Sequence, residues 1–261
     1  MLSVADVAQF LNEFAPPALA ESWDNVGLLV GRYDQPLARV MTCLTITSPS
    51  AAEAVAERAD LVVSHHPLPF RPLARLTSET SEGRLLLELI GAKIAVFSPH
   101  TAFDSAQQGI NQRLAGGLQL GDIGPLVPGV EAGQGAGRFG TLGKTITLEE
   151  LADRVKKLLA IENLQAVGPL DQHVRTVAVA CGSAGEFLEP AKVAGCDCLV
   201  TGEVRFHACL EAESLGMGLV LAGHFASERF AVEQLAGVLA REFPELEVWA
   251  SKQEKDPLHW L

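Results

Sequence analysis

Short apolar runs alternate with longer stretches of helical periodicity along most of the chain. The runs that predict strands are Val40–Ile46, Leu61–Val63, Lys93–Phe97, Thr176–Ala180, Cys198–Val200 and Gly218–Leu221. Helices are predicted between them near residues 50–58 and 83–90, and an amphipathic helix is predicted over residues 1–14. Strands that alternate with helices in this way indicate βαβ units and a mixed or largely parallel sheet with helices on both faces. The pattern therefore predicts an α/β fold.

A stretch rich in glycine and proline, residues 116–143, interrupts this rhythm. So many glycines cannot sustain a helix interior, so the stretch is expected to be a boundary or a long functional loop. After it, Thr147 and Glu150 form a capping box that predicts a new helix. We therefore expect a first lobe made of residues 1–125 and 201–261, and a second lobe over residues 126–200.

Charge and composition exclude several classes of function. Lys and Arg number 20 against 32 Asp and Glu, a formal net charge of −12, and there is no basic patch to attract nucleic acid. No window reaches 18 consecutive apolar residues, and the N-terminal helix lacks the basic start of a signal peptide. The five cysteines form no even framework and are expected to be reduced thiols. A cytoplasmic protein that binds neither nucleic acid nor membrane is predicted.

The histidines carry the strongest chemical signal, because five of the seven come just after a predicted strand. They are His65, His66, His100, His207 and His224. Open α/β sheets bind ligands at the carboxyl ends of their strands, where residues distant in sequence converge. His173 and His259 lie outside this pattern and are read as surface residues.

Carboxylates follow two of these histidines at a spacing of four residues. The pairs are His100 with Asp104, and His224 with Glu228. On a helical turn this spacing places both groups on one face, and a carboxylate can bridge two cations about 3.5–4 Å apart. The pattern predicts a metal site; the alternative is that each histidine caps or packs against its strand, which is the more common role of a single strand-end histidine.

At these residues the sequence resembles the Nif-three-like dinuclear metal-centre family, known in bacteria under the name GTP cyclohydrolase I type 2. The resemblance spans nearly the whole chain and rests on the segments Trp23–Gly31, Ala59–Pro67, Ser98–Asp104, Gly137–Gly140, Val177–Gly185, Thr201–His207 and Gly223–Glu228. It implies two related α/β lobes with mixed sheets flanked by helices, and a metal site at the strand C-terminal ends between the lobes. It also implies a homohexamer.

The resemblance assigns roles to individual residues. It implies that two divalent metal ions per chain are ligated by His65, His66, Asp104, His224 and Glu228. His100 and His207 are then additional groups beside the ions, and either is expected to shuttle a proton because histidine titrates near neutral pH. Imidazole and carboxylate ligands suit zinc, manganese, iron, cobalt or nickel, so the identity of the metal stays open.

The sequence departs from the family pattern at positions around the expected site. Thr45 stands where an aspartate is common after the first strand, and Glu203 also stands where an aspartate is usual. Gly182–Gly185 has one glycine where two are common; it is either a phosphate-holding turn at the start of a helix or a simple connection. Trp23 and Asp24 are read either as part of the site or as packing of the first lobe. These departures bear on substrate contacts more than on the five metal ligands.

Three functions follow as hypotheses. The first is a metal-dependent hydrolase of the GTP cyclohydrolase type, in which water activated by the two cations attacks C8 of the purine ring of a nucleotide such as GTP. The second is a non-catalytic regulatory or scaffold protein in which the ions stabilise the fold or sense the metal supply. The third is a nucleotide phosphoesterase that uses the same ligands. An open ligand position favours an enzyme, and a closed one favours a scaffold.

Overall fold

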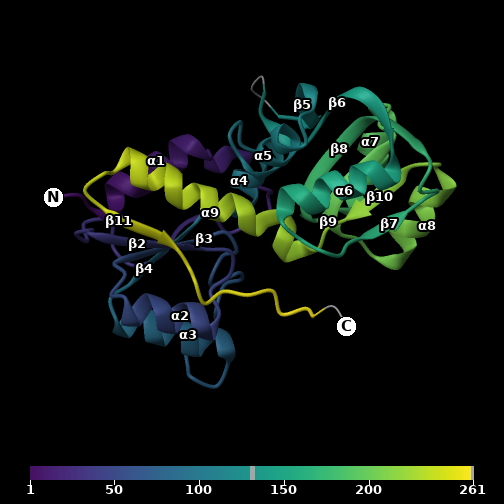
Figure 1. Ribbon diagram of the computed structural model, residues 1–261. Helices are drawn as coiled ribbons and strands as arrows, with labels where there is room; N and C mark the ends of the chain where they lie inside the picture. The colour runs from purple at the N-terminus through teal and green to yellow at the C-terminus, as the bar shows by residue number, and fades with distance from the viewer. Residues whose placement is uncertain (130–132, 260–261) are drawn as a thin grey trace. The chain divides into compact units, whose positions relative to one another are not determined.

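The computed structural model describes residues 1–129 and 133–259 and confirms the predicted α/β class. The chain divides into two compact units (Figure 1). Unit 1 consists of Met1–Phe103 and Ala231–Pro257, and unit 2 consists of Asp104–Phe230 with Leu258 and His259. Among the described residues, no helix is both long enough and apolar enough to cross a membrane.

Unit 1 is built on a five-stranded sheet in the order β1-β4-β3-β2-β11. The strands are β1 (Gly27–Val30), β2 (Arg39–Cys43), β3 (Leu61–Ser64), β4 (Ala95–Ser98) and β11 (Glu247–Ala250). The four strands from β4 to β11 run parallel, and β1 pairs antiparallel with β4. The carboxyl ends of β2, β3 and β4 therefore lie side by side at one edge of this sheet.

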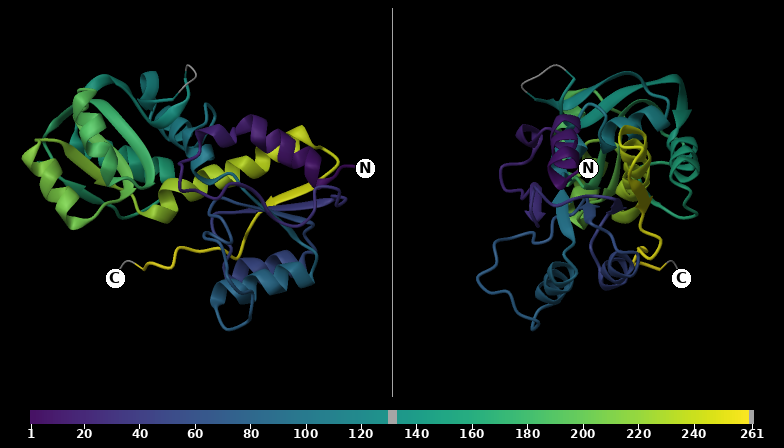
Figure 2. Two further views of the ribbon diagram at one scale, coloured as in Figure 1. Left: turned by 180° about the vertical axis from the view of Figure 1, so that it is seen from behind. Right: turned by 90° about the vertical axis from the view of Figure 1, so that its left-hand side faces the viewer.

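Helices cover both faces of the five-stranded sheet. Helices α2 (Ser48–Ala56) and α3 (Ser81–Gly91) pack on one face, where Ala51, Ala54, Leu86 and Leu89 meet Met41 and Val62 of the sheet. Helix α1 (Val4–Phe14) and the part of α9 (His224–Glu242) that belongs to unit 1 lie on the other face (Figures 1 and 2). Successive residues of β2, β3 and β4 are buried, as expected for parallel strands covered on both faces.

Unit 2 contains a six-stranded sheet in the order β5-β6-β8-β9-β10-β7. Its strands are β5 (Gly121–Pro128), β6 (Gly135–Thr147), β7 (Gln165–Val167), β8 (His173–Ser183), β9 (Cys198–Glu203) and β10 (Gly218–Leu221). Strands β8, β9 and β10 are parallel, while β6 and β7 pair antiparallel with their neighbours. The carboxyl ends of β8, β9 and β10 lie side by side, and polar residues such as Glu203 and His224 lie at or just after these ends.

The two faces of the six-stranded sheet bury different helices. Along β8, Val177 and Val179 face a core shared with α5 (Ile110–Gly117) and α6 (Leu148–Leu159). Ala178 and Ala180 face the opposite core, which is shared with α7 (Leu188–Val193) and α8 (Phe206–Ser214). This alternation follows from the two-residue period of a strand. The capping box at Thr147 and Glu150 is present at the start of α6, as predicted.

The glycine-rich stretch differs from its expectation as a boundary or loop, because it forms the antiparallel strands β5 and β6. The glycines are needed for close approach within this pair. At Gly135, with φ +142°, a Cβ atom would lie 2.2 Å from the carbonyl oxygen of Val127. Such a site excludes side chains, so a composition that is typical of loops here builds a sheet edge.

The division into units differs from the expected lobes of residues 1–125 with 201–261 and residues 126–200. Strand pairing is the reason: β9 and β10 hydrogen-bond to each other, and β9 pairs with β8, so residues after 201 belong to the six-stranded sheet. The chain enters unit 2 within α4 (His100–Ser105) and leaves it within α9.

Candidate metal centre

In unit 1, three histidines gather at the carboxyl ends of two adjacent parallel strands. His65 and His66 follow β3, and His100 follows β4 and begins α4. One ligand atom from each of these histidines lies within 4.8 Å of the others, so the three could hold a metal ion. The ring centroids are 5.1 to 5.6 Å apart. The strand-end pattern thus leads to a real side-chain cluster.

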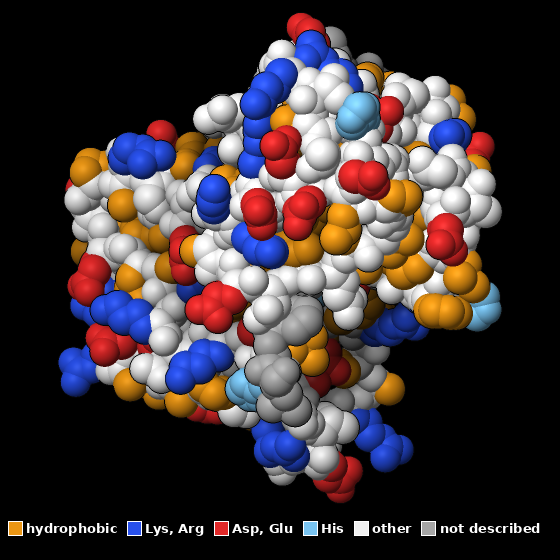
Figure 3. Space-filling model, turned by 45° about the vertical axis from the view of Figure 1, so that its right-hand side comes forward, with side chains coloured by type: hydrophobic (Ala, Val, Ile, Leu, Met, Phe, Trp, Pro, Cys, Tyr) orange, Lys and Arg blue, Asp and Glu red, His pale blue; other side chains and the backbone are white. Residues whose placement is uncertain are grey.

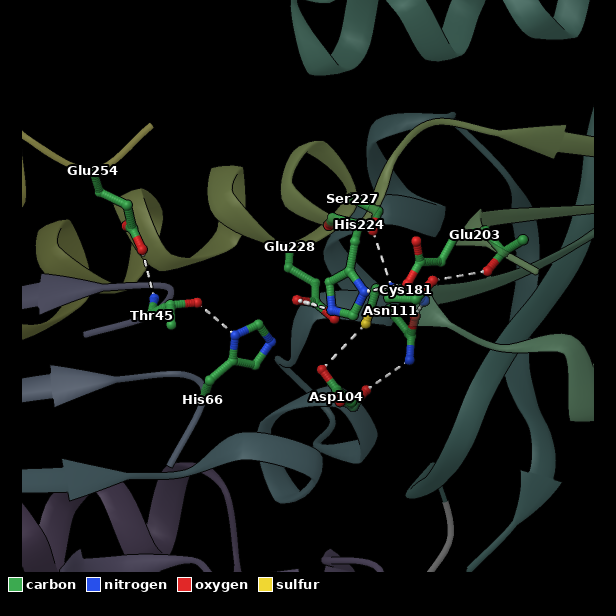
Figure 4. Close-up of polar contacts among 12 residues, drawn as sticks. Thr45, His66, Asp104, Asn111, Cys181, Glu203, His224, Ser227, Glu228 and Glu254 are labelled. Carbon is green, nitrogen blue, oxygen red and sulfur yellow. Dashed lines mark hydrogen bonds and ion pairs between the residues drawn. The ribbon is translucent and has the colours of Figure 1, made fainter. Parts of the chain in front are cut away.

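His66 is held by Thr45, one of the positions that departs from the family pattern. The Oγ1 atom of Thr45 lies 2.6 Å from Nδ1 of His66 (Figure 4). The backbone of this segment is fixed in turn by Glu254, whose carboxylate accepts hydrogen bonds from the N–H groups of Leu44 and Thr45. Thr45 therefore orients the His66 ring where an aspartate is common in the family. The carboxylate beside this segment belongs to Glu254, near the end of the chain.

His100 is held by a buried carboxylate. Nδ1 of His100 donates to Oδ1 of Asp24 over 2.6 Å, and the side chain of Asp24 is fully buried. Burial by itself raises the pKa of Asp24, but the hydrogen bonds from His100 and Thr101 outweigh it and lower the pKa to about 2. Asp24 is therefore ionised at neutral pH and fixes the tautomer of His100. The backbone of His100 has a φ of +27°, a strained value for a residue with a side chain.

In unit 2, His224 lies between two carboxylates. Its Nδ1 atom is 3.0 Å from Oε1 of Glu203 at the end of β9, and its Nε2 atom is 3.2 Å from Oε2 of Glu228. The hydrogen bond to Glu228 raises the pKa of His224 to about 9, against the opposing effect of burial and with further help from Glu203. Glu203 therefore acts on a histidine even though an aspartate is usual at its position.

Glu228 lies one helical turn after His224 in α9 and is buried, with 4% of its surface exposed. Gly182 at the end of β8 makes room for it: a Cβ atom there would lie 2.3 Å from Oε1 of Glu228 and 3.4 Å from Nε2 of His224. The N–H of Gly182 donates to Oγ of Ser227. Because position 182 carries no side chain, the Glu228 carboxylate can approach the His224 imidazole closely.

Asp104 belongs to the same part of unit 2. Its Oδ1 atom accepts a hydrogen bond of 3.2 Å from the thiol of Cys181, and its backbone carbonyl accepts one from Asn111 (Figure 4). Burial raises the pKa of Cys181, and the charges of Asp104 and Glu228 raise it further, so Cys181 stays a neutral thiol. The two predicted carboxylate ligands, Asp104 and Glu228, thus both raise the pKa of the Cys181 thiol.

In His66, His100 and His224 alike, the Nδ1 atom contacts a neighbouring side chain, and in His224 the Nε2 atom also lies 3.2 Å from Oε2 of Glu228. Their Nδ1 partners are Thr45, Asp24 and Glu203. Histidines that ligate metals nearly always have the second ring nitrogen fixed by such a partner, because this sets the tautomer and the ring orientation. The donor set of imidazoles and carboxylates therefore fits a divalent transition metal or zinc.

The other predicted residues lie elsewhere. His207 is exposed on α8, with the ring of Phe206 beside it. His173 is exposed at the start of β8, and His259 is exposed near the chain end, as expected for surface residues. In Gly182–Gly185, the N–H groups of Gly182 and Ala184 donate to Ser227 and to the carbonyl of Glu203, so these two donors are already used within the protein.

Sequence reasoning missed the partners of the histidines. Asp24 stands within the matched segment that begins at Trp23, but the alternative reading as packing gave no reason to join it to His100, 76 residues away. Cys181 and Glu254 carried no signal in spacing, because each approaches the site from a different strand end or from the chain terminus.

Comparison with known proteins identifies a family for nearly the whole chain. The family model described as Duf34/NIF3 (NGG1p interacting factor 3) matches residues 2–257. A protein of Clostridium acetobutylicum named GTP cyclohydrolase 1 type 2 homolog is 32% identical, with 98% of each chain covered. The GTP cyclohydrolase 1 type 2 of Helicobacter pylori strain J99 is 34% identical over 88% of each chain.

A solved structure of a related protein has the same fold as this chain. The crystal structure of a Staphylococcus aureus protein superimposes with a TM-score of 0.91 and 25% identity, covering 100% of this chain and 99% of that one. The family match spans nearly all of the sequence, and the two relatives match over 98% and 88% of their own lengths. The chain therefore belongs to the Duf34/NIF3 family.

Proposed function

We propose that the protein binds two divalent metal ions through His65, His66, Asp104, His224 and Glu228 and is a metal-dependent hydrolase that acts on a nucleotide such as GTP. The observation that carries the proposal is the fixed Nδ1 atom of His66, His100 and His224, which presents each Nε2 as a ligand or proton-transfer atom. The names of relatives at 32% and 34% identity support the reaction class.

The chemistry of such a site divides between the ions and the chain. Bound divalent ions supply Lewis-acid activation of water and of the substrate. His100 is suited to hold and move a proton at Nε2, because the ionised Asp24 holds its Nδ1 and fixes the orientation of the ring. His207, exposed on α8, is the second proposed proton carrier, because an exposed imidazole can exchange protons with solvent.

Product analysis tests the proposal. GTP is incubated with protein reconstituted with zinc, manganese or iron, and the purine ultraviolet absorbance and the release of inorganic phosphate are followed together. We expect the purine absorbance to fall with the metal-loaded parent protein. We expect no such fall when EDTA is present or when the Asp24→Asn variant is used. Phosphate release with the purine ring intact indicates the phosphoesterase instead. If neither product forms with any of the metals, the hydrolase proposal is wrong and the non-catalytic metal-binding role takes its place.

A further inference from the structure

Two large aromatic side chains remain exposed beside the histidine cluster of unit 1. Trp23 is 60% exposed and Phe70 is 42% exposed. Their ring centroids are 6.0 Å apart with an interplanar angle of 55°, so they form a tilted pair. Single exposed apolar residues are ordinary on protein surfaces, but two adjacent aromatic rings beside a polar cluster indicate a recognition surface.

The backbones that carry the two rings are tied down on both sides. Asn25 donates from Nδ2 to the carbonyl of Pro69, which joins the two loops directly. Glu21 donates its N–H to Oγ1 of Thr101, and the carboxylate of Asp24 holds His100 and Thr101. A fixed backbone with exposed rings lowers the entropy cost of binding, because only the ligand has to be ordered.

The aromatic pair adjoins the candidate metal ligands through His100. The centroid of the His100 ring lies 6.0 Å from that of Trp23 and 6.1 Å from that of Phe70. The same ring lies 5.1 Å from that of His65. A flat ligand stacked on one of the two rings, which are inclined at 55°, would meet the other ring at an angle and lie next to the His100 ring.

A positive charge stands at the same place. The guanidinium of Arg71 lies over the Phe70 ring, 5.9 Å from its centroid, and Arg71 is exposed. The chain as a whole carries a formal charge of −12, so a cation that projects from an aromatic surface here is suited to a ligand with a negative group. Aromatic faces combined with one guanidinium match a planar heterocycle that carries phosphate.

We propose that Trp23 and Phe70 bind the base of a purine nucleotide by stacking, and that Arg71 contacts its phosphate. This inference rests on the proposed function, because it names the part of the substrate that the site recognises and the residues that read it. Base stacking on aromatic side chains is tolerant of ring identity, so the pair selects for a planar ring, and the orientation of the ring toward His100 selects the purine edge that faces the metal ligands.

Equilibrium binding measured by titration calorimetry on the metal-containing protein tests the inference. The ligands are GMP, guanosine and ribose 5-phosphate, and the variants are Trp23→Leu, Phe70→Leu and Arg71→Gln. We expect the affinity for GMP to fall about ten-fold or more in each aromatic variant, since a stacked base contributes on that scale. Arg71→Gln is expected to weaken GMP binding and to leave guanosine binding unchanged.

Tyr33→Leu is the matched control, because Tyr33 is also an exposed aromatic residue of unit 1, at 56% exposure, and lies in a different loop. It should bind GMP as the parent protein does, and all variants should keep the parent melting temperature and metal content. The inference is overturned if the protein does not bind GMP, if GMP binds no better than ribose 5-phosphate, or if Trp23→Leu weakens GMP no more than Tyr33→Leu does. Failure of the proposed function would appear separately. In that case the protein would lack metal or turnover, while GMP binding would still depend on Trp23.

Discussion

Single side chains around the histidines fix the imidazole rings of the candidate metal centre. Thr45, Asp24 and Glu203 each contact the Nδ1 atom of one histidine, and none of them is itself among the proposed ligands. Such partners act by fixing ring orientation and raising ligand basicity, so their loss weakens metal binding without removing a donor atom. They are positioning residues, and their contribution can be measured apart from that of the ligands.

Replacing Thr45 tests this role at His66. Thr45→Val keeps the side-chain shape but removes the oxygen 2.6 Å from Nδ1, and we expect metal affinity to fall about 10- to 100-fold. Thr45→Ser keeps the hydroxyl and should retain affinity close to that of the parent. Competition with a chromophoric chelator measures both variants. Equal affinity in Thr45→Val and Thr45→Ser would show that Thr45 has no orienting role.

Sequence patterns located the strand-end histidines but not these partners. The apolar runs before His65 and His100 placed both residues at the same edge of a parallel sheet, and the structure brings them together. No local pattern links Thr45 to Glu254, because the two residues are 209 positions apart and meet only through the packing of the chain end. Local periodicity predicts where a strand ends, while hydrogen bonds between distant loops depend on the tertiary structure.

At the level of elements, the carboxyl end of β8 and the first turns of α9 pack closely against each other at Gly182 and Glu228. Gly182 has φ +65° and lies so close to Glu228 that no side chain fits between them. Gly216, at the end of α8, has almost the same φ of +64° but has nothing within 4 Å of the position of a Cβ atom. Substitutions at Gly182 and Gly216 therefore distinguish the cost of a positive φ, which both share, from the steric effect on the Glu228 carboxylate, which only Gly182 has.

Gly182→Ala is expected to displace the Glu228 carboxylate and to lower metal content, together with a loss of roughly 1–2 kcal/mol in the free energy of unfolding from the positive φ alone. Gly216→Ala should lose a similar amount of stability and keep the metal content of the parent. Elemental analysis and thermal unfolding measure the two effects. If both variants keep full metal content, the close approach at Gly182 does not position Glu228.

The chain end after β11 is anchored by one buried carboxylate of α2. Glu53 accepts hydrogen bonds from Oγ of Ser251 and from the N–H groups of Lys252 and Gln253. Burial raises the pKa of Glu53, but these hydrogen bonds outweigh it, and the pKa is lowered from its usual 4.5. A lowered pKa in the folded state means that the ionised form stabilises the fold.

The stability contributed by Glu53 is therefore fully present above about pH 4.5 and is lost as the pH falls through the lowered pKa. Glu53→Gln should reduce the free energy of unfolding by about 1–3 kcal/mol at pH 7, since hydrogen bonds to a charged group contribute on that scale. The difference between the variant and the parent should shrink below pH 4.5. Urea unfolding at several pH values measures it, and a difference that does not change with pH would contradict the assignment.

For the whole molecule, the fold class and most strands follow from the sequence, but the division into units does not. The predicted strands at Leu61–Val63, Cys198–Val200 and Gly218–Leu221 are present as β3, β9 and β10. The expected lobe boundary near 126 rested on the glycine-rich stretch, whereas the units are defined by which strands pair across long sequence separations. Apolar periodicity identifies a strand without identifying its partner.

The face of the molecule in Figure 3 carries charges of both signs. Figure 3 shows acidic and basic side chains interspersed over the face in view, without a broad basic area for a phosphate backbone. The homohexamer implied by the family resemblance and the cytoplasmic location stay predictions, which sedimentation and cell fractionation can test.

The most direct test of the central claim is the metal content of the protein, measured by elemental analysis after purification without added metal. His65→Ala and Glu228→Ala each remove one proposed ligand, and Tyr33→Leu serves as a surface control. About two equivalents of divalent metal per chain in the parent and the control, with a clear fall in both ligand variants, is the result that this account predicts. Metal-free parent protein that takes up no zinc, manganese or iron on dialysis would contradict it.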